Sequence, residues 1–219
     1  MINPPTFPVS ANQPILRADA VSCIRQDRVL FEQLCLSVEP GEMLHIAGKN
    51  GAGKSSLLRL LAGLAQPDDG IMFYQDKPLI DVISDYAANL CYIGHYSGIH
   101  EQLTALENLS FWRAAAGVPA ADDYALLAGL GLAGLEDIPC RMLSAGQQRR
   151  VSLARLWFTP CQLWILDEPF TALDQSAIAW LQQHFLQHLT RGGSIVLTTH
   201  QSLSLNYARL TTMELAYRW

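Results

Sequence analysis

Two stretches near the start of the chain alternate hydrophobic and polar residues with a period of two. Residues 16–24 and 29–38 show this pattern, which is typical of strands with one buried face. The polar residues 25–28 between them are suited to a turn. We therefore expect these two stretches to pair as antiparallel strands.

The remainder of the chain alternates short apolar runs with longer segments of helical periodicity. Further strands are predicted at residues 43–47, 71–74, 90–93, 163–166, 194–198 and 209–215. Helices are predicted at residues 55–64, 104–117, 122–130, 144–158 and 176–190. Strands that alternate with helices indicate an α/β fold with a mostly parallel sheet covered on both faces.

The middle of the chain differs from both ends. From about residue 95 to 159 it is helical and poor in β-branched residues, which predicts a helical subdomain inserted into the α/β core. Thr104-Ala105-Leu106-Glu107 and Ser144-Ala145-Gly146-Gln147 both fit the capping box that opens a helix. Residues 1–14 contain four prolines and lack a signal-peptide pattern, so we expect a flexible tail followed by one domain, residues 15–219.

Composition limits the class of protein. Half of the 219 residues are hydrophobic and 16% are charged, which indicates either a large core or apolar surface covered by partners. A net charge of -5 argues against a nucleic-acid partner held through phosphate contacts. No apolar run reaches the roughly 18 to 20 residues of a membrane helix. Five scattered cysteines are expected to be buried, reduced thiols: Cys23, Cys35, Cys91, Cys140 and Cys161.

A glycine-rich loop carries the first chemical signal. Gly48-Lys49-Asn50-Gly51-Ala52-Gly53-Lys54-Ser55, followed by Ser56, matches G-x-x-x-x-G-K-[ST] between a predicted strand and a predicted helix. Such a loop turns backbone N–H groups and a helix N-terminus toward phosphates. Lys54 is expected to reach the β- and γ-phosphates of ATP, and the hydroxyl of Ser55 to bind Mg²⁺.

The apolar run 163–166 ends in two carboxylates, Asp167 and Glu168. Asp167, at the strand end, is placed to hold Mg²⁺ through water. Glu168, one residue further, is the candidate base for an attacking water molecule. A solvated acidic turn is the alternative interpretation, which the neighbouring phosphate loop disfavours.

These motifs, with Leu143-Ser144-Ala145-Gly146-Gln147 between them, resemble those of the ATP-binding subunits of ABC (ATP-binding cassette) transporters. The resemblance covers essentially all residues after 15. It implies a P-loop NTPase core with mixed sheets, an antiparallel β subdomain and the inserted helical subdomain. It also implies that Ser144, Ala145, Gly146 and Gln147 act on the ATP held by a second copy in a head-to-tail dimer. Without the family, these residues are only a capped helix start.

Further positions take their meaning from the same resemblance. Asp174 matches the loop that crosses the dimer interface, and His200 matches the histidine that senses the γ-phosphate. Two positions depart from the family. His95 stands where the hinge to the helical subdomain usually has glutamine, and Arg25 stands where an aromatic residue usually stacks on adenine. A guanidinium can also stack on a base.

The Gly-His hinge and the alanine of Ser-Ala-Gly-Gln are similar to one branch of the family, the ATPases of cytochrome c maturation complexes, which handle haem. This implies a peripheral subunit at the cytoplasmic face of the bacterial inner membrane, bound to integral membrane subunits of that complex. We expect Tyr96, Phe111 and Trp112 to contact a short helix of such a partner. Histidines 45, 100, 184 and 188 are expected on a strand, a loop and a polar helix face, as ordinary structural or surface residues.

Three alternatives stay open from the sequence. The first is the ATPase of another small-molecule exporter. The second is a soluble cassette ATPase that acts on DNA or ribosomes, which usually has two cassettes or a coiled-coil insertion. The third is a small-molecule P-loop kinase, which would have no use for the Ser-Ala-Gly-Gln segment.

Overall fold

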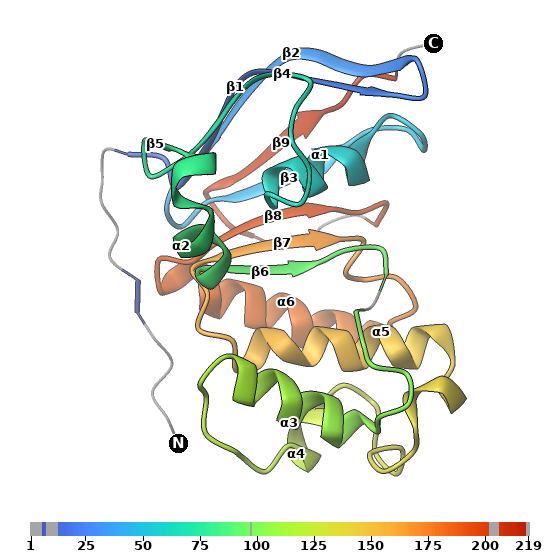
Figure 1. Ribbon diagram of the computed structural model, residues 1–219. Coiled ribbons are helices and arrows are strands. Elements are labelled where there is room, and N and C mark those ends of the chain that lie inside the picture. Colours follow the sequence, from blue (N-terminus) through green and yellow to red (C-terminus); the bar gives the residue numbers. More distant parts are fainter. Residues whose placement is uncertain (1–5, 8–12, 97, 202–205, 218–219) are drawn as a thin grey trace.

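Two β-sheets stacked on either side of one helix form the core of the computed structural model, which describes residues 6–7, 13–96, 98–201 and 206–217 (Figure 1). The first sheet is antiparallel, with strand order β2-β1-β4-β5. Its strands are β1 (Leu16–Arg25), β2 (Arg28–Val38), β4 (Asp69–Tyr74) and β5 (Lys77–Pro78). The predicted antiparallel pairing of the first two strands is confirmed, with Leu16 opposite Val38 and Arg25 opposite Arg28.

The second sheet is parallel, with strand order β6-β7-β8-β3-β9. Its strands are β6 (Leu90–Ile93), β7 (Leu163–Asp167), β8 (Ser194–Thr198), β3 (Met43–Ala47) and β9 (Leu210–Glu214). Every residue of β7 and β8 is buried, which explains why these strands appear in the sequence as unbroken apolar runs.

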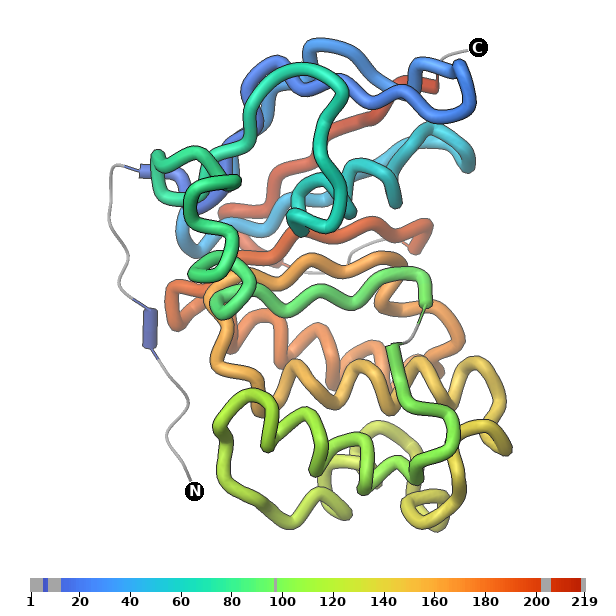
Figure 2. Tube along the Cα trace, in the orientation of Figure 1, coloured from blue at the N-terminus to red at the C-terminus, as the bar shows by residue number. Residues whose placement is uncertain are grey.

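Helices cover the parallel sheet on both faces, as Figures 1 and 2 show. Helix α1 (Lys54–Leu61) lies between the two sheets and packs in a core with residues of β1, β2, β3 and β7. Helix α6 (Gln175–Thr190) packs on the opposite face, in a second core that includes Trp164, Leu181 and Phe185.

A third core belongs to the middle of the chain, where α3 (Ala105–Ala115), α4 (Tyr124–Gly129) and α5 (Ala145–Leu153) pack together. Both predicted capping boxes are present. The Thr104 hydroxyl accepts a hydrogen bond from the Glu107 N–H at 3.1 Å, and Ser144 accepts from the Gln147 N–H at 3.2 Å. In each box the side chain three residues on accepts the N–H of the cap residue in return.

The structure also corrects several details of the sequence prediction. The first helix ends at Leu61, before Gly63, which has a left-handed backbone (φ +69). The predicted helix 144–158 ends at Leu153 and continues as the 3₁₀ turn η3 (Ala154–Trp157). Helix α2 (Ile83–Ala88) and the 3₁₀ turns η1 (Leu79–Val82) and η2 (Cys140–Met142) were not predicted.

Burial differs from the prediction at four side chains. Cys35 is exposed, whereas the other four cysteines are buried. His188 is only 5% exposed and His184 is partly buried, so the predicted polar helix face is wrong for both. Trp112, expected at the surface, is half-buried and packs against the third core. Of the tail, residues 1–5 and 8–12 lie outside the described residues, and the Phe7 N–H donates to the Arg191 carbonyl at 2.9 Å.

Candidate functional site

A pocket of about 460 Å³ opens beside the glycine-rich loop. It brings together most of the predicted site residues: Lys49, Asn50, Gly51, Gly53, Lys54, Ser55, Ser56, His95, Asp167, Glu168 and His200. These residues follow or end β3, β6, β7 and β8, because the carboxyl ends of parallel strands meet at one edge of the sheet. The pocket also includes Leu30, which was not predicted. Leu30 is one of several inward residues of β2, and nothing in the sequence distinguishes it.

The glycine-rich loop has the geometry of an anion-binding turn. A β-carbon at Gly48 would lie 2.6 Å from the Leu215 carbonyl oxygen, so no other residue fits there without movement. Gly53 precedes α1 with φ +101, and no side chain caps the helix or places an acidic group in its first turn. The first N–H groups of α1 are therefore available to phosphate oxygens. Ala52, also predicted in this loop, is buried and is not among the pocket residues.

Lys54 is held at the mouth of this loop. Its ammonium donates to the carbonyl of Gly48 at 2.6 Å and of Lys49 at 3.3 Å, and only 9% of the residue is exposed. These partners are carbonyl dipoles, so the positive charge stays available to a bound phosphate. An ammonium is a compact cation suited to that task.

Asp167 and Glu168 present unsatisfied carboxylate oxygens to the pocket. Asp167 is 3% exposed, and its Oδ1 accepts a hydrogen bond from the Thr198 hydroxyl at 2.7 Å. Among the described residues, the Oδ2 atom of Asp167 and the Oε1 atom of Glu168 are buried without a hydrogen-bond partner. Buried charged oxygens without partners are costly. With the Ser55 hydroxyl in the same pocket, this oxygen set fits a hydrated Mg²⁺ ion.

Glu168 has a strained backbone. Its φ of +49 lies in the left-handed region, which non-glycine residues seldom occupy. Its N–H donates to the Thr198 hydroxyl at 3.0 Å, and its Oε2 accepts from the N–H of His200 at 3.2 Å. The His200 ring nitrogen Nε2 lies 3.5 Å from Oε1 of the same carboxylate. In this backbone conformation the Glu168 carboxylate lines the pocket and lies next to His200.

The two departures from the family differ in their placement. His95 lines the pocket with the loop and the carboxylates. Arg25 does not line it. Its Nη1 atom donates to the Ile24 carbonyl at 2.6 Å and lies 3.3 Å from the Asp68 carboxylate.

The Ser144–Gln147 segment is separate from the pocket of its own chain. Ser144 and Ala145 are exposed, and no residue of the segment lines the pocket. Gly146 has an additional role within the chain, because a β-carbon there would lie 2.8 Å from the β-carbon of Ala172. The segment therefore packs against the loop that contains Ala172.

That loop is tied to α5 by Arg150. Its Nη2 atom donates to the Ala172 carbonyl at 3.3 Å and lies 3.4 Å from the Asp174 carboxylate. Asp174 caps α6 by accepting the N–H of Ala177 at 2.9 Å. The hydrogen bond from Ser176 is the main cause that lowers the pKa of Asp174 from its ordinary value. Asp174 thus stays ionised at the start of α6.

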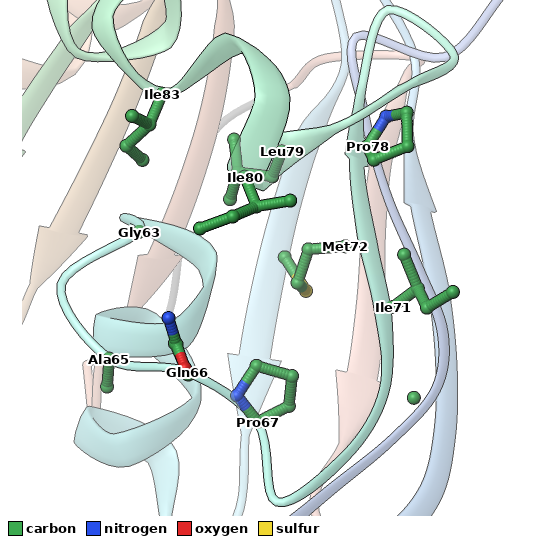
Figure 3. A pocket seen from close by; sticks show the side chains of 11 residues that line it. Gly63, Ala65, Gln66, Pro67, Ile71, Met72, Pro78, Leu79, Ile80 and Ile83 are labelled. Atoms are coloured by element: carbon green, nitrogen blue, oxygen red, sulfur yellow. The ribbon is translucent and has the colours of Figure 1, made fainter.

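A larger cavity, of about 590 Å³, lies on another part of the surface and shares no residue with this pocket. Figure 3 shows its apolar lining, to which Met72, Leu79, Ile80 and Ile83 contribute. Ile80 is 67% exposed. The larger of these two hollows is therefore mainly apolar, whereas the pocket beside the glycine-rich loop holds the charged groups.

Comparison with known proteins places this geometry in a family context. The family model described as ABC transporter matches residues 31–171. Three curated relatives carry the name "Cytochrome c biogenesis ATP-binding export protein CcmA". The one from Idiomarina loihiensis is 50% identical over 95% of this chain and 96% of the relative. The one from Pseudomonas fluorescens is 52% identical (87% and 91%), and the one from Yersinia pestis is 49% identical (86% and 87%).

Solved structures show the same fold. The structure titled "Structure of ATP binding subunit of ABC transporter" has a TM-score of 0.75 and 28% identity, over 85% of this chain and 79% of that one. A dimeric ATP-binding cassette in a post-hydrolysis state, bound to ADP and Pi, has a TM-score of 0.73 and 22% identity, over 85% and 88%. Among the described residues, none of the helices is both long and apolar enough to cross a membrane.

Proposed function

The chain belongs to the ABC transporter family, and on that premise we propose that it is the ATP-hydrolysing subunit of an export complex for cytochrome c biogenesis. The observation that carries the proposal is the identity of about half of all residues with the cytochrome c biogenesis relatives, over nearly their full length. The clustering of Lys54, Asp167, Glu168 and His200 around one pocket supports ATP hydrolysis there. Haem is the substrate we propose for the complex.

The residues of the pocket divide the chemistry between them. The N–H groups of residues 48–56 bind the phosphates, and Lys54 neutralises charge on the β- and γ-phosphates. Ser55 and Asp167 would hold Mg²⁺, which supplies further neutralisation of the phosphates when bound. Glu168 accepts a proton from the attacking water, and such a base contributes about 10²- to 10⁴-fold in rate. His200 donates to the γ-phosphate and orients Glu168.

Two further pocket assignments concern His95 and Arg25. His95, at the hinge, bonds the water shell of the metal, and Arg25 stacks on the adenine ring. For Arg25 this requires its side chain to leave the contact with Asp68, since it does not line the pocket in this structure. Leu30, which does line it, offers an apolar surface to the nucleoside.

The complete site is proposed to need two copies of the chain. Ser144 and Ala145 are exposed at the start of α5 and do not line the pocket of their own chain, so they are accessible to the ATP of a partner copy. The Ser144 oxygen already accepts the Gln147 N–H, and its hydroxyl hydrogen remains free to donate to a γ-phosphate. Asp174, beside the same segment, would lie at the dimer interface.

The test of this function is Glu168→Gln, which removes the base and keeps the size of the side chain. The purified variant should bind ATP and form a stable dimer in its presence, measured by size-exclusion chromatography with light scattering. Cells that carry only this variant should lack covalently attached haem in their c-type cytochromes, visible by haem staining of gels. Normal c-type cytochromes in those cells would exclude the proposed pathway, and an ATP-bound monomer would exclude the shared site.

Attachment to membrane subunits at the cytoplasmic face is proposed to involve the exposed aromatic residues near the hinge. Tyr96 is 87% exposed and Phe111 62% exposed. Replacing both with alanine should release the subunit from membranes during fractionation while nucleotide affinity stays within about twofold, because neither lines the pocket. Tyr124→Ala, at an exposed tyrosine elsewhere in the helical region, is the control. Full membrane retention of the double variant would contradict this attachment.

A further inference from the structure

Arg149 is a buried cation that joins three functional segments. It lies in α5, five residues after Ser144, and is only 7% exposed. Its Nη1 atom donates to the carbonyl of Gly94 at 2.5 Å, and its Nη2 atom donates to the carbonyl of Asp167. One guanidinium thus contacts the hinge, the carboxylate strand and the helix that begins with the Ser144–Gln147 segment.

The position of these two carbonyls explains why a guanidinium is needed. Strands β6 and β7 pair in parallel up to Ile93 and Leu166. Gly94 and Asp167 are the next residues along, where β6 leaves the sheet. Beyond this point β6 and β7 are no longer paired, although Asp167 still pairs with Thr198 of β8, and the planar fork of an arginine can satisfy two acceptors at once. Arg149 therefore closes the end of the β6–β7 ladder from outside the sheet.

Burying the charged guanidinium of Arg149 costs free energy, which indicates a role beyond packing. Within the part of the chain that the structure describes, both hydrogen-bond partners of the buried Arg149 guanidinium are backbone carbonyls. A buried cation without a directly paired carboxylate is expensive to keep. The same ladder end could be closed by water or by a neutral amide at lower cost.

What Arg149 holds is the backbone on two sides of the nucleotide pocket. Gly94 immediately precedes His95, and Asp167 immediately precedes Glu168 with its left-handed backbone. The chain is closely packed at Gly94, because a β-carbon there would lie 2.4 Å from the Tyr92 hydroxyl oxygen. A shift of either carbonyl is therefore transmitted to α5 and to its first residues.

We propose that Arg149 is a positioning residue that couples the ATP pocket of one copy to the Ser144–Gln147 segment which the same copy presents to its partner. The coupling rests on the proposed two-copy site. When ATP moves the hinge or the carboxylate strand, the guanidinium moves α5 with them and places Ser144 for the partner's ATP. Binding at one site then favours closure of the other through direct contacts.

The test uses Arg149→Gln and Arg149→Lys in the Glu168→Gln background, where ATP should hold the dimer closed. Monomer affinity for a fluorescent ATP analogue is measured beside the ATP concentration that gives half-maximal dimer. We expect nucleotide affinity to stay within about threefold, while the half-maximal concentration rises about tenfold or more for glutamine. Lysine keeps the charge but reaches one carbonyl at a time, so Arg149→Lys should give an intermediate half-maximal concentration. This second variant also provides a test if the glutamine variant does not fold.

Arg155 provides the matched control. It lies in η3, directly after α5, and its Nη2 atom donates to the carbonyl of Tyr92 in β6 at 2.5 Å. Arg155 therefore contacts β6 but neither Gly94 nor Asp167, and neither arginine lines the pocket. Arg155→Gln should leave both the nucleotide affinity and the ATP concentration for half-maximal dimer unchanged, even if it lowers thermal stability. Dimer formation at an unchanged ATP concentration in the Arg149 variants would overturn the proposal, as would a loss of nucleotide affinity equal to the loss of dimer. Absence of a dimer in Glu168→Gln alone would instead count against the two-copy site.

Discussion

At the scale of single residues, Gly146 is constrained both by its proposed contact with a partner and by packing within its own chain. It lies in the segment proposed to face the partner's ATP, and within its own chain it packs against Ala172. Ala172 itself has a left-handed backbone, with φ +61. The glycine is therefore needed for contact between α5 and the loop before α6, independently of any phosphate.

Gly146→Ala should lower the free energy of unfolding by about 1–3 kcal/mol, because the new methyl group overpacks this contact. Adding Ala172→Gly should recover most of the loss, since it removes the opposing methyl and suits a positive φ. Urea unfolding of the two single variants and the double variant measures the coupling. Ala145→Gly, at an exposed neighbouring position, is the control. Equal stability of Gly146→Ala and the double variant would refute the contact.

At the scale of elements, the two capping boxes have the same local geometry in different surroundings. Thr104 opens α3 inside the helical region, whereas Ser144 opens α5 at the surface proposed to face a partner. In both, the cap hydroxyl accepts the N–H three residues on. Their stability effects should therefore be equal and their functional effects should differ.

Thr104→Ala and Ser144→Ala are each expected to cost about 1 kcal/mol of unfolding free energy through loss of the cap. Only Ser144→Ala should also lower ATP hydrolysis per folded molecule, by tenfold or more, since it loses a donor to the phosphate. Thermal unfolding and steady-state phosphate release provide the two readouts. A similar fall in activity for both variants would show that Ser144 acts only as a cap.

Elements with a clear period could be predicted from the sequence. The bounds of β3, β6 and β8 match the prediction, because each is a short apolar run between polar turns. Helix α2 was missed because it is short and presents one fully buried large side chain, Tyr86, to the core. The grouping of the loop, the carboxylates and His200 was predictable because all follow parallel strands, whereas the role of Arg149 was not. Its carbonyl partners come from segments distant in sequence, and no side-chain pattern marks them.

At the scale of the whole molecule, His188 links stability to pH. Its ring stacks on Trp164 with centroids 3.6 Å apart, and its Nε2 atom bonds the Gln162 carbonyl at 3.1 Å. Gly193 leaves room for it, since a β-carbon there would lie 2.2 Å from the ring. Burial is the main cause that lowers the pKa of His188 to about 3. The folded chain therefore keeps this imidazole neutral over a range in which the unfolded chain protonates it.

Since the unfolded state binds the extra proton below the ordinary pKa of about 6.5, stability should fall as pH drops from 6.5 toward 3. The contribution of His188 approaches about 1.4 kcal/mol per pH unit in that window. His188→Gln keeps a donor for the Gln162 carbonyl and does not titrate. Urea unfolding at several pH values should show that the unfolding free energy of this variant depends less steeply on pH. Part of the pH dependence that remains is expected from His184, whose pKa is also lowered by burial. An unchanged slope would rule out a buried neutral His188.

The strand order has a consequence for how the protein is made. Strand β3, which leads into the phosphate loop, has β8 and β9 as its two neighbours in the sheet, and both come from the last part of the chain (Figure 1). During synthesis the loop therefore leaves the ribosome long before its strand can be paired. The antiparallel sheet and the helical middle can form earlier from local contacts. We therefore expect the nucleotide pocket to form late, so that unfinished chains bind ATP poorly.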